Sequence, residues 1–386
     1  MHVVAILVAI ALLGLLYLWL RPNRAEIDPR LALEVWDAVA DGLHNSNTDL
    51  IVWQGDFWLA HDARPYHFGS PDARLVVRRS RDGRHWEEMR RFQVPGKDIR
   101  DPKLAVIDGK LHLYALPNSG VAATPEGTML ATSPDGVTWT ELAPIEPDGW
   151  LFWRPKSNDG GKTWYVPAYW KHHGKSILLR STDGMRWEQV SVIQDGNGND
   201  ETDIEFLPDG RLLATTRLEV TPDKILGNAD GRTGIHVAAP PYTEWTTRES
   251  RVTRLDGPNL FSLDGQVFAV ARYQASPNRF PTRMGGVLSR KRTSIYRVDV
   301  PEPGEGTDRA RGSRSEPRLV RLSDLPSNAD TSYAGVAIRD GFLWIDWYTS
   351  RTDRDWPWLF GMPLRTDIKM ARIPLDALRA LSAATP

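Results

Sequence analysis

Apolar and polar residues follow one plan six times along the chain. Each unit has a polar cluster, a strand-like apolar run, a turn that contains glycine, and a second strand-like run. The six units are HNSNTDLIVWQGDFWLA from His44, DIRDPKLAVIDGKLHLYA from Asp98, FWRPKSNDGGKTWYVPA from Phe152, DETDIEFLPDGRLLATTR from Asp200, DGPNLFSLDGQVFAVAR from Asp256 and DTSYAGVAIRDGFLWIDWY from Asp330. Short apolar runs on both sides of such a turn are typical of a β-hairpin. The pattern therefore predicts six hairpins of related structure.

The spacing of the hairpins indicates how they assemble. Their turn glycines recur about every 50 residues, which suits a four-stranded propeller blade. We therefore predict an all-β fold, a six-bladed β-propeller, over residues 44–386. The last interval is longer because residues 301–317, PEPGEGTDRARGSRSEP, form an insertion that we expect to be flexible. Helical solenoids are excluded because the chain lacks a 3.6-residue periodicity.

The chain opens with an uncharged apolar run, HVVAILVAIALLGLLYLWL, at residues 2–20. A helix rises about 1.5 Å per residue, so this run is long enough to span the apolar core of a bilayer. It has neither a basic leader nor a small-residue cleavage site, and therefore predicts an uncleaved transmembrane anchor within residues 1–24 rather than a signal peptide. Residues 25–43 would form a lead-in segment.

Composition excludes several classes of function. The net charge is −1, so no basic field attracts nucleic acid, and no nucleic-acid partner is expected. The chain has no cysteine, which rules out disulfides, thiol catalysis and zinc sites with cysteine ligands. His172 and His173 are adjacent, so on a strand they would point to opposite faces and could not bind one ion. We predict neither a metal nor a cofactor.

A second, shorter repeat lies between the hairpins. It reads SRDGRHW at residues 80–86, SPDGVTW at 133–139 and STDGMRW at 181–187. Serine and aspartate side chains can bind the turn backbone while the tryptophan packs beneath it, so we expect a structural role.

These motifs resemble the Asp boxes of the sialidase superfamily, and the resemblance extends over most of the chain. In addition, ETDIEFLPDGRLLATTR is similar to the sialidase segment that carries a glutamate and a later arginine, and DTSYAGVAIRDG is similar to the sialidase tyrosine segment. The resemblance implies a retaining exo-glycosidase, which the apolar run at residues 2–20 would anchor in a membrane. Its substrate would be a glycan that ends in sialic acid or a related acidic sugar.

Propeller geometry brings the polar clusters together. The innermost strand of each blade starts at one end of the axis, and the second strand ends there. The residues expected at this end are Asp49, Arg64, Arg100, Asp101, Lys103, Arg154, Glu201, Asp203, Arg217, Asn259, Arg272 and Tyr333. Converging guanidinium groups would repel one another unless an anion joined them, which indicates an acidic ligand. The predicted substrate-binding residues are Arg64, Arg100, Asp101, Asp203, Arg217, Asn259 and Arg272.

The resemblance implies roles for the central residues. Arg217 and Arg272 match two members of the carboxylate-binding arginine triad of sialidases. The first hairpin reads SNTDLI where sialidases have Arg-Ile-Pro, so Arg100 or Arg64 would have to replace the third member, and we prefer Arg100. Tyr333 would be the nucleophile, activated by Glu201 as base, as in glycosidases that use tyrosine.

The general acid is sought in the loop ARPYHFGSPDARL, which offers Asp72, with Asp62 and His67 nearby. An acid there would need a raised pKa to stay protonated. Each assignment has a plain structural alternative. Asp72 would be a turn residue, Tyr333 a packing residue, and Glu201 a salt-bridge partner of Arg217.

Two other functions remain open from the sequence. Arg100-Asp101-Pro102 also resembles the RDP motif of five-bladed arabinosidases and fructosidases, in which case Asp49, Asp101 and Glu201 would supply the acids and base. The second alternative is a non-catalytic propeller that binds a glycan or a protein.

The orientation in the membrane also remains open. Arg21, Arg24 and Arg30 follow the apolar run and place that flank in the cytoplasm by the positive-inside rule, whereas a sialidase function favours the extracytoplasmic side.

Overall fold

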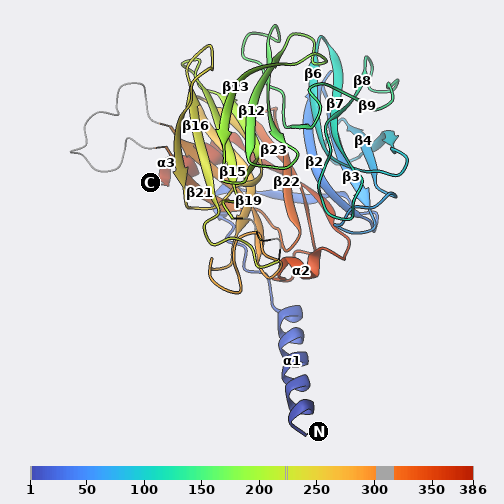
Figure 1. Cartoon of the computed structure of the whole chain (residues 1–386), viewed down its shortest axis with the longest axis vertical. Helices are drawn as coiled ribbons and strands as arrows, with labels where there is room; N and C mark the ends of the chain where they lie inside the picture. The colour runs from blue at the N-terminus through green and yellow to red at the C-terminus, as the bar shows by residue number, and fades with distance from the viewer. Residues whose placement is uncertain (1, 222, 224, 301–316, 386) are drawn as a thin grey trace, which may run out of the picture.

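Six four-stranded antiparallel sheets surround a common axis in this computed structural model, which describes residues 2–221, 223, 225–300 and 317–385. The predicted six-bladed β-propeller is confirmed (Figure 1). Blade 1 contains β2 His44–Trp53, β3 Asp56–Arg64, β4 Arg74–Ser80 and β5 Glu87–Phe92; blade 2 contains β6 Asp98–Ile107, β7 Lys110–Asn118, β8 Met129–Ser133 and β9 Ala143–Pro144; blade 3 contains β10 Trp150–Phe152, β11 Trp164–Trp170, β12 Lys175–Ser181 and β13 Glu188–Asp195. Blade 4 contains β14 Asn199–Phe206, β15 Leu212–Leu218, β16 Arg232–Ala238 and β17 Thr246–Ser250; blade 5 contains β18 Asp256–Leu263, β19 Gln266–Gln274, β20 Lys291–Asp299 and β21 Arg318–Asp324; blade 6 contains β22 Thr331–Arg339, β23 Phe342–Thr349, β24 Asp367–Pro374 and β1 Glu34–Val39.

The core lies between neighbouring blades. In one cluster, Trp58 and Leu75 of blade 1 pack against Leu104 and Leu113 of blade 2, and all four are almost fully buried. Alternate residues of each strand point to opposite faces of its sheet. Each blade can therefore contact both of its neighbours, and the ring is held by apolar packing.

The ring closes with a strand from near the N-terminus. Strand β1 pairs antiparallel with β24, with Glu34 opposite Arg372 and Val35 opposite Ala371. Residues 25–43, expected as a lead-in, thus supply the outer strand of blade 6, and the propeller begins before residue 44. Its EVWDAV pattern is too short to be distinguished from a loop without its partner strand. The chain ends in β24 and helix α3 Leu375–Ala384.

The three short repeats close turns, as the sequence predicts. In the motif at residues 133–139, Oδ1 of Asp135 accepts the backbone N–H groups two and three residues later, at 2.8 and 2.6 Å. The Gly136 N–H donates to Ser133 Oγ at 2.8 Å, and Trp139 Nε1 donates to the Gly136 carbonyl at 3.0 Å. The same bonds recur at residues 80–86 and 181–187.

Five of the six inner strands contain a bulge near their first residues. The pairing register shifts between Ser46 and Asp49, Arg100 and Lys103, Asn199 and Thr202, Asp256 and Asn259, and Ser332 and Gly335. Asp101 and Tyr333 lie inside these bulges with positive φ angles of 53° and 50°. A bulge redirects side chains relative to a regular strand. Asp101, Glu201 and Tyr333 therefore leave their strands at bulges.

One apolar helix, α1 His2–Leu20, projects from the propeller (Figure 1). It is long and apolar enough to cross a membrane, and its length and composition suit a membrane anchor or a signal sequence. The short helices η1 Pro29–Leu31 and α2 Trp358–Gly361 complete the described elements. The predicted insertion at residues 301–317 lies outside the described residues except for Pro317.

Candidate active site

A tyrosine of blade 6 and a glutamate of blade 4 meet near the axis. The Tyr333 hydroxyl donates to Oε1 of Glu201. The other glutamate oxygen, Oε2, accepts the Gly257 N–H at 2.6 Å and lies 2.9 Å from Nη1 of Arg217. Glu201 is 4% exposed, whereas Tyr333 is only partly buried. The phenol is therefore held by a fully bonded carboxylate and keeps some access to solvent.

Gly257 makes room for the tyrosine ring. A Cβ at this position would lie 2.8 Å from Cδ2 and 2.9 Å from Cγ of Tyr333, which is closer than real contacts. The Trp153 and Tyr333 ring centroids lie 6.1 Å apart, and the Arg272 guanidinium lies 5.6 Å from the centre of the Tyr333 ring. The phenol is thus fixed by packing on several sides.

Burial shifts the pKa of both groups upward. It raises the pKa of Glu201 to about 7, although the charge of Arg217 opposes the shift. Burial, and then the negative charge of Glu201, raise the pKa of Tyr333 well above its ordinary value of 10. The phenol is therefore protonated at neutral pH, and Glu201 is the group that titrates near neutrality.

Each central arginine has a carboxylate partner in the protein. Nε of Arg217 donates to Asp200 at 2.7 Å, and Nε of Arg272 donates to Asp256 at 2.9 Å. Asp256 and Arg272 face each other directly in the pairing of β18 and β19. Repulsion between these arginines is therefore offset without a ligand, and their convergence does not by itself indicate an acidic ligand.

The two arginines considered as the third triad member, Arg64 and Arg100, also have a carboxylate partner in the protein. Nη1 of Arg64 lies 3.1 Å from Asp98, and its Nη2 contacts Asp62. Nε of Arg100 donates to the same Asp98 at 2.8 Å. Asp98 thus lies between Arg64 and Arg100, and both guanidiniums belong to one buried ionic network.

Unused donors remain on two arginines. A guanidinium has five N–H donors. In Arg217, Nε and Nη2 bind Asp200 and Nη1 binds Glu201, which leaves one N–H on each terminal nitrogen. In Arg272, only Nε has a hydrogen-bond partner among the described residues. The terminal nitrogens of Arg272 next to Tyr333 can therefore bind a carboxylate in a two-pronged fork.

Asp203 and Asn259 join the blades. Oδ2 of Asp203 accepts the Leu260 N–H at 2.7 Å, and Nδ2 of Asn259 donates to the Ala334 carbonyl at 3.0 Å. Arg154 binds Asp49 at 2.7 Å. These side chains are buried and already hydrogen-bonded, so the structure uses them to hold the inner strands together.

Asp101 and Lys103 lie at the bulge of β6. Oδ1 of Asp101 is buried and has no hydrogen-bond partner among the described residues. Its charge is close enough to raise the pKa of Tyr333. Lys103 lies 4.4 Å from the centre of the Trp153 ring, and burial lowers its pKa to about 8. An unpaired buried carboxyl oxygen is costly, so Asp101 is a good candidate to bind a ligand hydroxyl.

The predicted acid, Asp72, lies in an exposed turn before β4. Its N–H donates to Ser70 Oγ at 3.2 Å, and no described contact joins it to Tyr333 or Glu201. Asp62, by contrast, is fully buried. Burial raises its pKa to about 6, despite the neighbouring Arg64.

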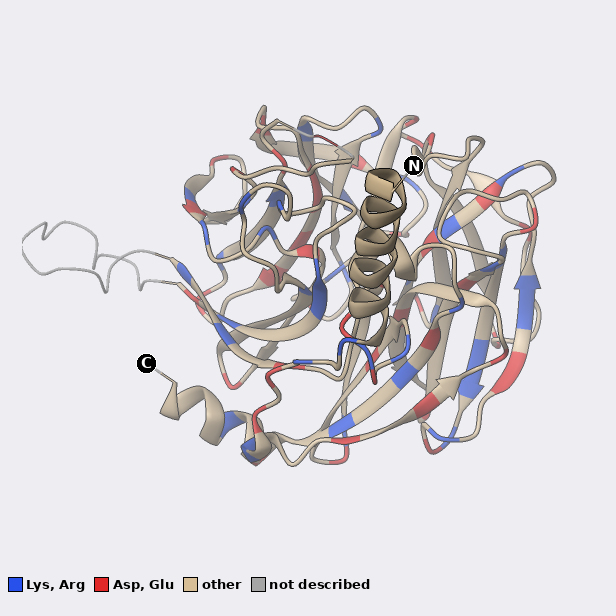
Figure 2. Ribbon diagram, turned by 90° about the horizontal axis from the view of Figure 1, so that it is seen from below, with Lys and Arg blue, Asp and Glu red and all other residues tan. Residues whose placement is uncertain are grey.

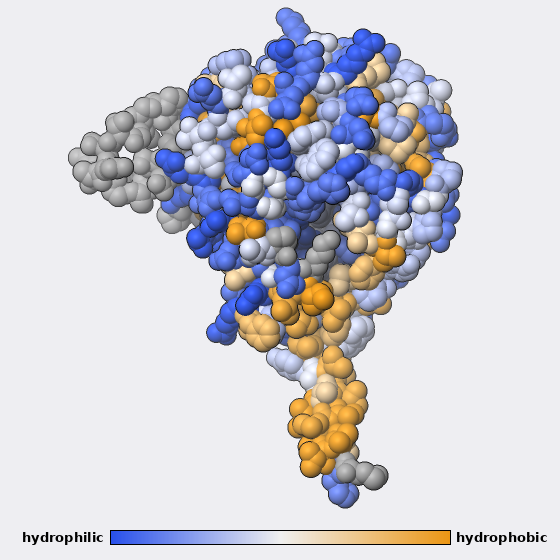
Figure 3. All heavy atoms as spheres, viewed as in Figure 1, coloured by the Kyte–Doolittle hydropathy of each residue, from blue (hydrophilic) through white to orange (hydrophobic). Residues whose placement is uncertain are grey.

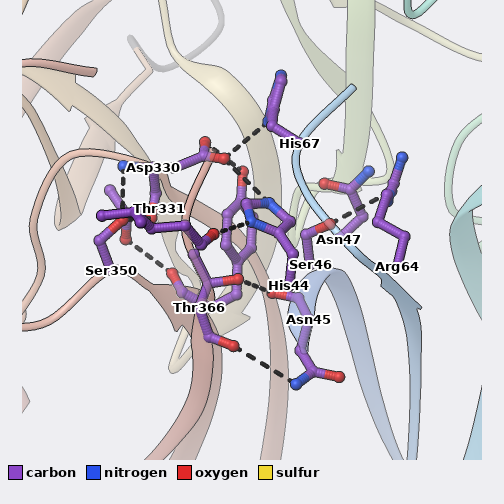
Figure 4. Close-up of polar contacts among 12 residues, drawn as sticks. His44, Asn45, Ser46, Asn47, Arg64, His67, Asp330, Thr331, Ser350 and Thr366 are labelled. Carbon is purple, nitrogen blue, oxygen red and sulfur yellow. Dashed lines mark hydrogen bonds and ion pairs between the residues drawn. The ribbon is translucent and has the colours of Figure 1, made fainter. Parts of the chain in front are cut away.

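A buried cluster at the start of β22 was not anticipated (Figure 4). Oδ2 of Asp330 lies 3.1 Å from Nε2 of His44 and 2.7 Å from Nδ1 of His67. Its Oδ1 accepts from Trp358 Nε1 at 2.9 Å and from the Tyr348 hydroxyl at 3.2 Å. Burial alone would raise the Asp330 pKa, but the two histidines hold it well below its ordinary value. The cluster fixes the backbone three residues before Tyr333.

The donor types in this cluster also suit a cation, as do those of His173, Asp200 and Glu219. The absence of a metal stays a prediction.

The sequence also missed Asp200, Asp256 and Lys291. The signal for the aspartates was present, because a hairpin repeat opens at each of Asp98, Asp200, Asp256 and Asp330. Lys291 had no such signal, since it lies on the third strand of its blade. Its ammonium group lies 3.1 Å from the centre of the Trp358 ring, and burial lowers its pKa well below 10.5.

Comparison with known proteins supports the fold. No family model matches the chain, and no curated protein matches its sequence. Among solved structures, a phage phi92 endosialidase superposes with a TM-score of 0.62 at 11% identity, covering 89% of this chain and 69% of that one. A Trypanosoma rangeli sialidase in complex with sialic acid superposes with a TM-score of 0.62 at 12% identity, covering 93% of this chain and 61% of that one. The chain thus spans about three fifths of the T. rangeli protein. A Bombyx mori β-fructofuranosidase superposes with a TM-score of 0.46 at 18% identity. The chain therefore has the six-bladed β-propeller fold that is found in sialidases.

Proposed function

We propose that the protein is a retaining exo-glycosidase that hydrolyses a terminal sialic acid or a related acidic sugar. The observation that carries this proposal is the hydrogen bond from Tyr333 to Glu201, next to an arginine, Arg272, whose terminal nitrogens are unused. A tyrosine nucleophile suits a substrate whose own carboxylate would repel an aspartate or glutamate.

The residues suggest the following sequence of steps. The substrate carboxylate binds the free N–H groups of Arg272 and Arg217. Glu201 takes the phenolic proton as the Tyr333 oxygen attacks the anomeric carbon, and the glycosidic bond breaks as a general acid protonates the leaving oxygen. Water then cleaves the tyrosyl–sugar bond and gives its proton to the deprotonated general acid, and the phenol recovers its proton from Glu201. Because the Tyr333 pKa is raised, proton transfer to Glu201 must accompany the attack.

Two carboxyls compete for the role of general acid. Asp72 is the residue that the sialidase resemblance implies, but it is exposed. Asp101 is buried beside Tyr333 with one free oxygen. We retain Asp72 as the proposed acid, with Asp101 as the alternative. A nitrophenol leaving group departs without being protonated. Of the two variants that lack Asp72 or Asp101, only the one that lacks the general acid should therefore recover activity on a nitrophenyl substrate.

The neutral-sugar alternative is weakened by one observation. It needs a free carboxylate at Asp49, but Oδ1 of Asp49 binds Arg154 at 2.7 Å and Oδ2 accepts the Leu104 N–H at 2.7 Å. Both oxygens are therefore occupied by groups that hold the blades together.

The decisive experiment incubates the full chain, in detergent, with fluorogenic conjugates of sialic acid, glucuronic acid and arabinose. Release from the sialic acid conjugate that disappears in Tyr333→Phe supports the proposal. Cleavage of the arabinoside alone would reject it. Saturable binding of sialic acid without turnover would identify a binding propeller.

A further inference from the structure

Apolar side chains are exposed on the loops at the same end of the propeller as the candidate active site. They are Tyr66 and Phe68 between β3 and β4, Val121 between β7 and β8, Ile225 between β15 and β16, Phe280 between β19 and β20, and Leu359 in α2. We call these six residues the apolar rim. Their exposure reaches 71% at Val121, 68% at Ile225 and 67% at Phe280. Such a concentration of apolar residues marks an interaction surface.

The loops that carry the rim are joined by backbone hydrogen bonds. The Val287 N–H donates to the Ile225 carbonyl at 3.0 Å, and the Leu359 N–H donates to the Val287 carbonyl at 2.8 Å. On the other side, the Gly69 N–H donates to the Val121 carbonyl at 2.8 Å. These bonds hold the loops of neighbouring blades against one another. The rim is therefore a set of positioned side chains and not a group of independent loop tips.

Helix α1 leaves the propeller from the same layer of loops. The Trp356 indole donates to the Trp19 carbonyl at 2.8 Å, and the two rings lie 4.4 Å apart. Immediately after the helix, Arg21 pairs with Asp355 at 2.9 Å, and its carbonyl accepts the Asp355 N–H at 2.8 Å. No free linker separates the helix from the propeller. Figure 2, seen from this end, shows α1 in front of the ring of strands.

A membrane that contains α1 would therefore meet the rim directly. Figure 3 shows apolar residues continuing from the helix onto the adjoining part of the propeller. Tryptophan is favoured at the boundary between lipid and water. Trp19 lies at the end of α1 that joins the propeller, where its ring contacts Trp356. Exposed aromatic and aliphatic residues beside them would enter the headgroup region, as in proteins that lie on membranes.

We propose that the apolar rim docks on the bilayer that α1 crosses, so that the active site opens toward the membrane surface and takes an acidic sugar carried by a lipid. The docking rests on the position of α1 and the rim. The nature of the substrate rests, in addition, on the proposed function.

The opposite end of the propeller supplies matched controls. Val137 and Met185 are 58% and 52% exposed, but they lie on turns between the third and fourth strands of their blades, away from α1. Because the chain has no cysteine, a single cysteine can be introduced at any of these positions and labelled alone.

The first experiment places the full chain in phosphatidylcholine vesicles. Cysteine replaces Phe280, Val121, Val137 or Met185 in separate variants, and each is labelled with an environment-sensitive dye. Lipids brominated on their acyl chains should quench the dye at positions 280 and 121 by about twofold or more, because rim residues would lie about 5–10 Å into the boundary. Positions 137 and 185 should show no quenching. Equal quenching at all four positions, quenching at none, or removal of residues 1–20 from the mature protein would overturn the proposal.

The second experiment separates docking from catalysis. Phe280→Glu and Ile225→Glu should lower turnover of a sialylated glycolipid in vesicles about tenfold and leave turnover of a soluble sialoside within twofold, since both residues lie on the rim. An equal loss on both substrates would reject the membrane-facing substrate. If neither substrate is cleaved by the unmodified chain, the proposed function fails while the quenching result still decides the docking.

Discussion

The phenol oxygen of Tyr333 on blade 6 donates a hydrogen bond to Glu201 on blade 4, although the two residues are 132 positions apart in the sequence. The contact is made near the axis, in front of blade 5, where the bulges of β14 and β22 release both side chains from their strands. The proposed nucleophile and its proposed base are thus already in hydrogen-bond contact, which is the arrangement expected if attack and proton transfer occur together.

Replacing Tyr333 with phenylalanine should abolish turnover of an acidic sugar conjugate and leave its binding nearly unchanged. Only the attacking oxygen is lost, while the ring still packs on Gly257 and Trp153. We expect a fall in kcat of at least about a thousandfold, measured by fluorogenic release, with Kd measured by calorimetry. Tyr242→Phe is the matched control, because its hydroxyl donates to Gly210 on blade 4. A Tyr333→Phe variant with normal kcat would exclude the nucleophile assignment.

Activity should rise with pH up to about neutrality. Burial raises the Glu201 pKa to about 7, and only the ionised carboxylate can accept the phenolic proton. Below that value, the ionised fraction falls about tenfold per pH unit, so kcat/KM should fall by the same factor. A rate profile from pH 4.5 to 8 checks this, and Glu201→Gln should be inactive throughout. An acidic limb near pH 4 would show that Glu201 is not the titrating base.

Arg272→Gln should weaken binding of an acidic sugar more than it slows chemistry. The variant removes the guanidinium group, whose terminal nitrogens have no hydrogen-bond partner among the described residues. Glutamine can still make one of the two hydrogen bonds, and the loss of one charge-assisted bond, about 1.5–3 kcal/mol, corresponds to an increase in KM of about 10- to 150-fold. Arg379→Gln, an exposed residue paired with Asp264, serves as control. If both variants bind the ligand equally well, the carboxylate is held elsewhere.

Asp346 should make the protein less stable as pH rises. Burial raises its pKa to about 8, from 3.8, so the folded state holds a proton that the unfolded state releases. Its contribution is therefore complete below pH 3.8, decreases by up to about 1.4 kcal/mol per pH unit between 3.8 and 8, and changes no further above pH 8. Asp346→Asn keeps an acceptor for the Gly335 N–H, which binds Oδ1 at 2.5 Å. Urea unfolding at pH 5 and 8 should show a smaller decrease in this variant than in the unmodified chain, in which Glu201 and Asp62 contribute to the same decrease.

Gly136→Ala should destabilise the protein far more than Gly109→Ala. Both glycines have positive φ, 76° and 73°, so each substitution strains the backbone by about 1–2 kcal/mol. A Cβ at residue 136 would also lie 1.9 Å from Trp58 of blade 1, whereas nothing lies within 4 Å of a Cβ at residue 109. We expect a further loss of about 1–3 kcal/mol at residue 136, measured by chemical denaturation. Equal losses would show that the turn can move away from Trp58.

The repeats in the sequence were sufficient to predict the blades, because each hairpin is a local structure with its own turn signal. They also located Tyr333, Glu201, Arg217 and Arg272 at one end of the axis. They did not predict β1, since a six-residue strand is stabilised by its pairing with β24 and not by its own pattern.

The pairing of side chains at the site could not be predicted from the sequence either. Whether Arg217 meets Asp200 or a ligand depends on bulges that shift the register by whole residues, and no local pattern marks them. The resemblance to sialidases named Asp72 as acid, but its exposure depends on how the β3–β4 loop packs against neighbouring loops. Such contacts join residues that are far apart in the chain.

The pairing of β1 with β24 also sets the order of events during biosynthesis. Residues 34–39 leave the ribosome more than 300 residues before their partner strand, residues 367–374. No nascent chain can complete the circle before residues 367–374 have been translated. A chain whose α1 enters a membrane during translation would therefore acquire its final tertiary structure while already tethered.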